Sequence, residues 1–160
     1  IRVSTELGRG STFSIYLPAT GSTAQSELRL SGELMRGNEL ILLIDDEDMI
    51  LDVGRGILEK LGYKVLTACS GQEALDVFRS QNERIDLVIL DMIMPDMGGA
   101  QTFDQLKAMS PKTKILLSSG YSIDEQASEI LKRGCNGFIQ KPFGIKELSQ
   151  KIRKVVEARG

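Results

Sequence analysis

Residues 39–158 alternate five times between a short apolar run and a longer segment in which apolar residues recur with a helical period. Nearly every residue in each run is apolar, which is typical of parallel strands covered on both faces. Parallel neighbours require a crossover, and the helical segments supply it. We therefore predict an α/β domain of three layers, with a five-stranded parallel sheet between five helices. The predicted strands are LILLI (40–44), KVLTA (64–68), DLVIL (86–90), KILLS (114–118) and GFIQ (137–140).

The helical segments carry their own start and stop signals. Capping boxes are expected from Ser70 to Glu73 and from Ser122 to Glu125, at the starts of the second and fourth helices. The third helix is expected at about 99–109, and the fifth has its apolar residues between 145 and 156. For the first helix, about 48–61, the predicted buried face is Ile50, Val53, Ile57, Leu58 and Leu61.

The chain before residue 39 has a different composition. Residues 1–17 alternate apolar and polar side chains around a GRGS turn, which predicts a small hairpin. Residues 18–38 are rich in Gly, Ser, Thr and Gln, as expected of a linker, so the compact domain is predicted over 39–160. Because the sequence starts at Ile1 inside a predicted strand, we expect a piece of a longer polypeptide.

Composition excludes several classes of function. With 20 basic and 22 acidic residues, the chain has no overall attraction for nucleic acid or anionic lipid, and no apolar run is long enough to cross a membrane. The absence of histidine removes histidine-dependent nucleophile pairs and any phosphohistidine on this chain. The two cysteines, Cys69 and Cys135, form no disulfide framework, so a cytoplasmic location is expected.

Polar residues gather where the predicted strands end. Asp45 and Asp46 follow the first strand, Asp91 follows the third, and Lys141 follows the fifth. In a sheet of order 2-1-3-4-5 the first and third strands are neighbours at the switch point, where such sheets bind ligands. Three carboxylates would therefore share one pocket, and their mutual repulsion calls for a compensating cation. Serine hydroxyls, Ser118 and Ser119, end the fourth strand beside them.

This combination suits phosphoryl transfer. Mg²⁺ prefers oxygen ligands and fits the carboxylates better than zinc does. Together with Lys141, a divalent ion would neutralise the charge on a phosphoryl group while a carboxylate attacks in line. Asp91 is the best candidate nucleophile, because it stands alone at its strand end before the turn MPDMGG. The predicted product is an aspartyl phosphate.

Four motifs, LILLIDDED, DLVILDMIMPDMGG, KILLSSGY and GFIQKPF, closely resemble the receiver domain of bacterial two-component response regulators over about 39–158. The resemblance implies a flavodoxin-like fold in which Asp91 is phosphorylated by a phosphohistidine donor. Lys141 would contact the phosphoryl oxygens, and the Lys141–Pro142 bond would be cis. The implied Mg²⁺ site comprises Asp45, Asp46, Asp91 and Ile93, with direct bonds from Asp46, Asp91 and the Ile93 carbonyl.

The resemblance also implies a switch. Ser119, directly before Gly120, matches the family's switch hydroxyl better than Ser118, and Phe138 would be the switch aromatic. Phe138 departs from the tyrosine of many members, and Gly98 replaces a more usual Asp or Ser cap. The responding surface would be the fourth helix, strand 137–140 and the fifth helix, through which a weak dimer is expected.

Residues 6–18, ELGRGSTFSIYLP, resemble the closing strands of the histidine-kinase ATP-binding domain. A kinase ending, a linker and a receiver is the order of hybrid sensor histidine kinases. The implied function is a phosphoacceptor module that assists its own phosphotransfer and works with a histidine kinase phosphoacceptor domain or a histidine phosphotransfer protein. Three alternatives are a flavin or nucleotide-binding domain, a protein-binding pseudo-receiver that is not phosphorylated, and a DNA-binding regulator supported only by the basic last helix.

Overall fold

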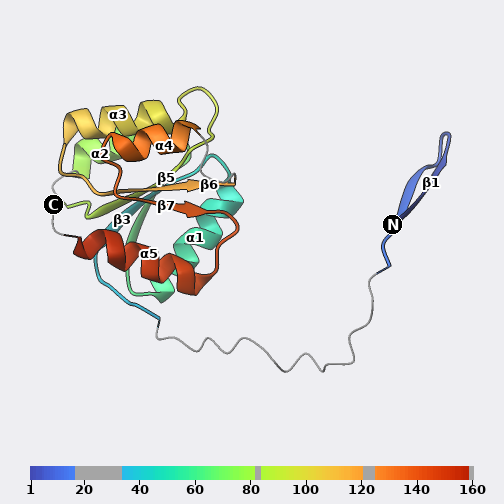
Figure 1. Cartoon of the computed structure of the whole chain (residues 1–160), viewed down its shortest axis with the longest axis horizontal. Helices are drawn as coiled ribbons and strands as arrows, with labels where there is room; N and C mark the ends of the chain where they lie inside the picture. Colours follow the sequence, from blue (N-terminus) through green and yellow to red (C-terminus); the bar gives the residue numbers. More distant parts are fainter. Residues whose placement is uncertain (17–33, 82–83, 121–124, 159–160) are drawn as a thin grey trace. The chain divides into compact units, whose positions relative to one another are not determined.

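The computed structural model describes residues 1–16, 34–81, 84–120 and 125–158, and divides the chain into two compact units, 1–31 and 32–160 (Figure 1). Each unit is described by itself. Most of the predicted linker and the predicted cap at Ser122 lie outside the described residues.

The larger unit contains a parallel sheet of five strands in the order β4-β3-β5-β6-β7. If β3 is numbered as the first strand of this sheet and β4 as the second, the order is the predicted 2-1-3-4-5, so the sheet prediction is confirmed. β5 and β6 each end one residue later than expected, because Asp91 still pairs with Ser118 and Ser119 still pairs with Gln140. The strands are β3 (Leu40–Ile44), β4 (Lys64–Ala68), β5 (Leu87–Asp91), β6 (Ile115–Ser119) and β7 (Gly137–Gln140).

Helices cover both faces of this sheet and give the predicted flavodoxin-like arrangement of three layers (Figure 1). α1 and α5 pack on one face, whereas α2, α3 and α4 lie on the other. Each face has its own apolar core, since alternate residues of a strand point to opposite sides. The helices are α1 (Asp48–Lys60), α2 (Gly71–Gln81), α3 (Gly99–Met109), α4 (Glu125–Lys132) and α5 (Ile145–Glu157).

The buried face of α1 differs from the prediction. Leu51 is buried, while Val53, expected to be inside, is 59% exposed. The cause is Gly54, whose absent side chain lets the helix approach β3: a Cβ there would lie 2.7 Å from Leu43 Cδ2. The rest of the predicted face holds, because Leu58 and Leu61 are buried and Ile57 packs against the same core.

Local signals at the other helix starts are partly as expected. The Glu73 backbone N–H donates to Ser70 Oγ at 3.2 Å, which is one half of the predicted capping box of α2. The Glu73 carboxylate accepts from the Cys69 N–H rather than from that of Ser70. α3 starts at Gly99, and its N-cap residue Gly98 makes no side-chain cap, as the glycine implied.

The smaller unit is the predicted hairpin, with β1 (Arg2–Glu6) antiparallel to β2 (Gly10–Ser14). Val3 pairs with Phe13, so these two apolar side chains lie on the same face of the hairpin. Both are more than half exposed, at 58% and 67%, as is Ile15 at 64%. Within residues 1–16 the hairpin therefore leaves an apolar face without cover.

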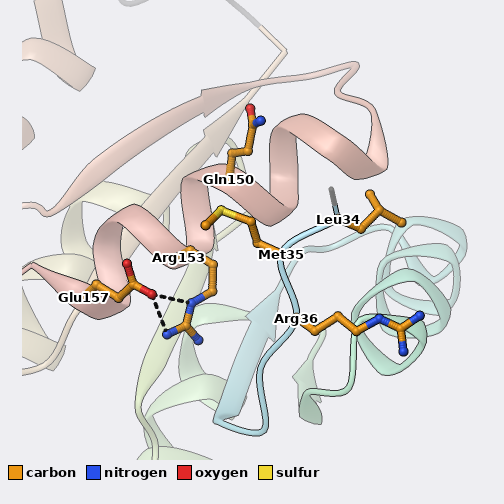
Figure 2. A pocket seen from close by; sticks show the side chains of 6 residues that line it. All are labelled: Leu34, Met35, Arg36, Gln150, Arg153 and Glu157. Carbon is orange, nitrogen blue, oxygen red and sulfur yellow. Dashed lines mark hydrogen bonds and ion pairs between the residues drawn. The ribbon is translucent and has the colours of Figure 1, made fainter. Parts of the chain in front are cut away.

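The larger unit starts before the predicted boundary at residue 39. Leu34 packs against the core on the α5 side, and the Gly37 N–H donates to the Leu61 carbonyl at 3.1 Å. Figure 2 shows Met35 beside α5, where it lines a pocket together with Arg153. Residues 34–38 are thus part of the packed unit.

None of the helices in the described part of the chain is both long enough and apolar enough to cross a membrane.

Candidate phosphoacceptor site

Lys141 joins two buried carboxylates at the carboxyl ends of the strands. Its Nζ lies 2.5 Å from Asp45 Oδ2 and 2.6 Å from Asp91 Oδ1. Asp45 directly follows β3 and Asp91 ends β5, and these two strands are neighbours. The structure therefore brings together three of the predicted site residues from positions that lie up to 96 residues apart in the sequence.

Burial governs the charges of this cluster. Desolvation raises the pKa of Asp91 despite the opposing hydrogen bond and charge of Lys141. For Lys141, burial alone would lower the pKa, but hydrogen bonds to Asp45 and Asp91 outweigh it, so the pKa is raised and the ammonium stays protonated. Asp91 is consequently a more basic carboxylate than an exposed one, held next to a fixed positive charge.

The turn after Asp91 is held close to the Asp91 carboxylate. The Ile93 N–H donates to Asp91 Oδ2 at 2.8 Å, and the Gly99 N–H donates to the Met92 carbonyl at 3.1 Å. A Cβ on Gly99 would lie 2.5 Å from the Asp91 carbonyl oxygen, so only glycine permits this approach of α3. Sequence reasoning did not single out Gly99, although the pair of glycines after the turn was the available signal.

Asp46, the second acid after β3, is exposed and Asp45 is buried. Among the described residues, no three acidic or cysteine side chains converge in a metal-binding arrangement. Lys141 Nζ contacts both Asp45 and Asp91. The donor set still suits Mg²⁺, which takes one or two carboxylates and keeps several waters.

The two predicted switch residues lie on neighbouring strands. Ser119, the last residue of β6, is buried, and Phe138 of β7 is half-buried against the core on the α2, α3 and α4 side. The Ser119 carbonyl accepts the Lys141 N–H at 2.7 Å, so the backbones of these two residues are joined directly. The Lys141–Pro142 bond is cis, as the resemblance implied.

Comparison with known proteins defines the class. The response regulator receiver domain family matches residues 41–153, and the chain belongs to that family. It is accordingly a receiver domain of two-component signal transduction, and the alternative of a pseudo-receiver that is not phosphorylated is not favoured.

Individual relatives agree. Sensor kinase CckA of Brucella abortus is 30% identical over 167 residues, covering 98% of this chain and 18% of the kinase. The chain therefore spans about a fifth of that relative's length. A receiver domain from Clostridium thermocellum has a TM-score of 0.71 at 33% identity, covering 74% of this chain and 94% of the other. Response regulator TrrA of Thermotoga maritima, solved in complex with Mg²⁺ and BeF, has a TM-score of 0.66 at 33% identity, with 73% and 98% covered.

Proposed function

We propose that Asp91 accepts a phosphoryl group from a phosphohistidine. The observation that carries this proposal is the Lys141 ammonium, 2.6 Å from one Asp91 oxygen and held in place by Asp45. The raised pKa makes Asp91 a more basic carboxylate and therefore a better nucleophile. In an ion pair with only a structural role, the cation would instead be expected to lower the pKa of the carboxylate.

In the transfer, an Asp91 carboxylate oxygen forms a bond to phosphorus as the phosphorus–nitrogen bond of the donor breaks. The electron pair of the broken bond stays on the imidazole nitrogen, which takes up a proton from solvent. Lys141 Nζ is close enough to turn from the Asp91 oxygen to the arriving phosphoryl oxygens and to stabilise the charge spread over them. The chain thus assists its own phosphorylation.

We further propose that Asp46, Asp91 and the Ile93 carbonyl hold Mg²⁺, with Asp45 beside them as the second acid. When bound, the ion supplies two positive charges that offset the repulsion between the carboxylates and an incoming phosphate. The Mg²⁺ in the solved complex of TrrA supports this assignment.

The test is to incubate the chain with a small phosphodonor and Mg²⁺ and to weigh it intact. We expect one added phosphoryl group in the wild-type chain, none in Asp91→Asn, and none when a chelator removes the metal. Beryllofluoride binding followed by amide NMR gives a second measure on the same samples. Equal labelling of the wild type and Asp91→Asn would overturn the assignment.

Phosphorylation would change the surface formed by α4, β7 and α5. A phosphoryl group on Asp91 offers the Ser119 hydroxyl a charge-assisted hydrogen bond, and its inward movement leaves space for the Phe138 ring. This surface is where we place a weak dimer contact.

We propose that the chain comes from a hybrid sensor histidine kinase in the cytoplasm. The uncovered apolar face of the hairpin, with Val3 and Phe13, is what a strand pair cut from an ATP-binding domain would show. The alignment with a sensor kinase over 98% of the chain supports the same origin. Partners would be the kinase's phosphohistidine-bearing domain or a histidine phosphotransfer protein, and neither nucleic acid nor a membrane surface. Two free cysteines, Cys69 and Cys135, fit a reducing compartment.

A further inference from the structure

Ser118 is a buried serine whose hydroxyl has no hydrogen-bond partner among the described residues. The residue is 3% exposed, and among the described residues its Oγ is one of two side-chain polar atoms buried without a partner. Such a group costs free energy in the folded protein and calls for a reason.

The register places Ser118 beside the phosphoacceptor. Ser118 pairs with Asp91 across β6 and β5, and paired residues in a parallel sheet point to the same face. That face carries Ile89 and Leu116, each two residues earlier in its strand, which pack in the core on the α1 and α5 side. Its backbone is fixed too, because the Ser118 carbonyl accepts the Met92 N–H at 3.0 Å.

Both oxygens of Asp91 already accept a hydrogen bond. Lys141 donates to Oδ1 and the Ile93 N–H donates to Oδ2. When Lys141 turns to a phosphoryl group, the Oδ1 position that it occupied becomes open to another donor. Ser118 is the residue paired with Asp91 in register, and its hydroxyl can take a new direction by rotation about the Cα–Cβ bond.

We infer that Ser118 is a positioning residue for the phosphorylated state: its hydroxyl donates to the Asp91 carboxyl oxygen that Lys141 leaves when it turns to the phosphoryl group. The inference rests on the proposed phosphorylation of Asp91. The hydroxyl is left without a partner in the unphosphorylated chain and gains one after transfer, so it favours the phosphorylated form.

Ser149 supplies a matched control. It is equally buried, but its Oγ already donates to the Lys146 carbonyl at 2.8 Å, on α5. Alanine at position 149 therefore removes an existing hydrogen bond, whereas alanine at position 118 removes a hydroxyl that has none.

The experiment compares wild type, Ser118→Ala and Ser149→Ala in two measurements. The first is beryllofluoride affinity with Mg²⁺, followed by amide NMR, and the second is the denaturant midpoint of the chain without metal or beryllofluoride. For Ser118→Ala we expect affinity about tenfold weaker, the value of one hydrogen bond to a charged group, with an unchanged or higher midpoint. For Ser149→Ala we expect unchanged affinity and a lower midpoint. The pair Ser118→Thr and Ser118→Val, equal in shape, tests the hydroxyl again, and only Thr should keep the wild-type affinity.

Unchanged affinity in Ser118→Ala, or equal affinity of the Thr and Val variants, would overturn the inference. A lower midpoint in Ser118→Ala would also overturn it, because the hydroxyl would then have a partner before phosphorylation. If wild type itself neither binds beryllofluoride nor is labelled at Asp91, the proposed function fails instead, and the two failures are distinguishable.

Discussion

Two clusters in the receiver unit have the same charge arrangement, one cation between two carboxylates, at opposite ends of β3. After β3, Lys141 lies between Asp45 and Asp91. Before β3, Arg153 of α5 lies between Glu39, at 2.5 Å, and Glu157, at 3.0 Å. The side chains of Asp45 and Asp91 are 3% and 7% exposed, whereas that of Glu157 is 61% exposed.

The two clusters differ in the geometry of their cation, a planar guanidinium in one and an ammonium in the other. Arg153 donates from Nε and Nη2 to one Glu157 oxygen and from Nη1 to Glu39, so its planar group is fixed by three bonds (Figure 2 shows the two to Glu157). Burial alone would raise the pKa of Glu39, but backbone hydrogen bonds and Arg153 outweigh it and lower the pKa. At Asp91 burial wins and the pKa is raised. The guanidinium of Arg153 is thus fixed between Glu39 and Glu157, and we call this arginine cluster the clamp. In the lysine cluster, a single ammonium contacts a carboxylate whose pKa is raised.

The largest difference between the clusters should appear on removal of the lysine. We expect Lys141→Met to slow labelling of Asp91 by about a hundredfold, as loss of one preorganised donor to a transition-state oxygen does. Labelling rates followed by intact mass measure this. Lys154→Met, at an exposed lysine of α5, is the matched control and should label at the wild-type rate. Equal slowing in both variants would show a general charge effect.

Removal of residues 34–38, which precede Glu39 of the arginine cluster, should affect stability and leave the chemistry intact. A chain beginning at Glu39 loses the packing of Leu34 and the bond from Gly37 to Leu61, so we expect its free energy of unfolding to be about 2 kcal/mol below that of a chain beginning at Leu34. Urea unfolding of the two chains measures this difference in the free energy of unfolding. Equal stability would mean that residues 34–38 do not belong to the folded unit.

A single substitution in the clamp should have a smaller effect. For Glu39→Gln we expect a loss of about 1 kcal/mol in unfolding free energy, because the ion pair with Arg153 is only partly buried. Labelling of Asp91 should stay within about twofold of wild type. A large loss of labelling would show that the clamp acts on the site.

The sequence predicts the sheet and the lysine cluster, but it does not predict the ion pair between Glu39 and Arg153. The strand ends follow from the apolar runs, and the order 2-1-3-4-5 of a flavodoxin-like sheet then places Asp45 and Asp91 on neighbouring strands. Glu39 and Arg153 are 114 residues apart and belong to no motif, so nothing local links them. The sequence also could not show that the Ser118 hydroxyl lacks a hydrogen-bond partner among the described residues, because this depends on the side chains that pack around it.

The smallest expected effect is on the acid stability of the clamp. Since the pKa of Glu39 is lowered from its ordinary value of 4.5, its ionised form stabilises the fold above that pH, and the contribution is lost as pH falls through the lowered pKa. The difference in unfolding free energy between wild type and Glu39→Gln should therefore shrink in acid. A difference that stays constant between pH 7 and pH 3 would contradict the ion-pair assignment.

The most direct test exchanges the cations, comparing the labelling rate of Asp91 in Lys141→Arg and Arg153→Lys. Each variant keeps its positive charge and changes only its shape and hydrogen-bonding geometry. We predict that Lys141→Arg loses labelling at least tenfold, because a planar fork cannot replace a point charge between Asp45 and Asp91, while Arg153→Lys labels like wild type and unfolds more easily. Wild-type labelling in Lys141→Arg together with lost labelling in Arg153→Lys would contradict the account.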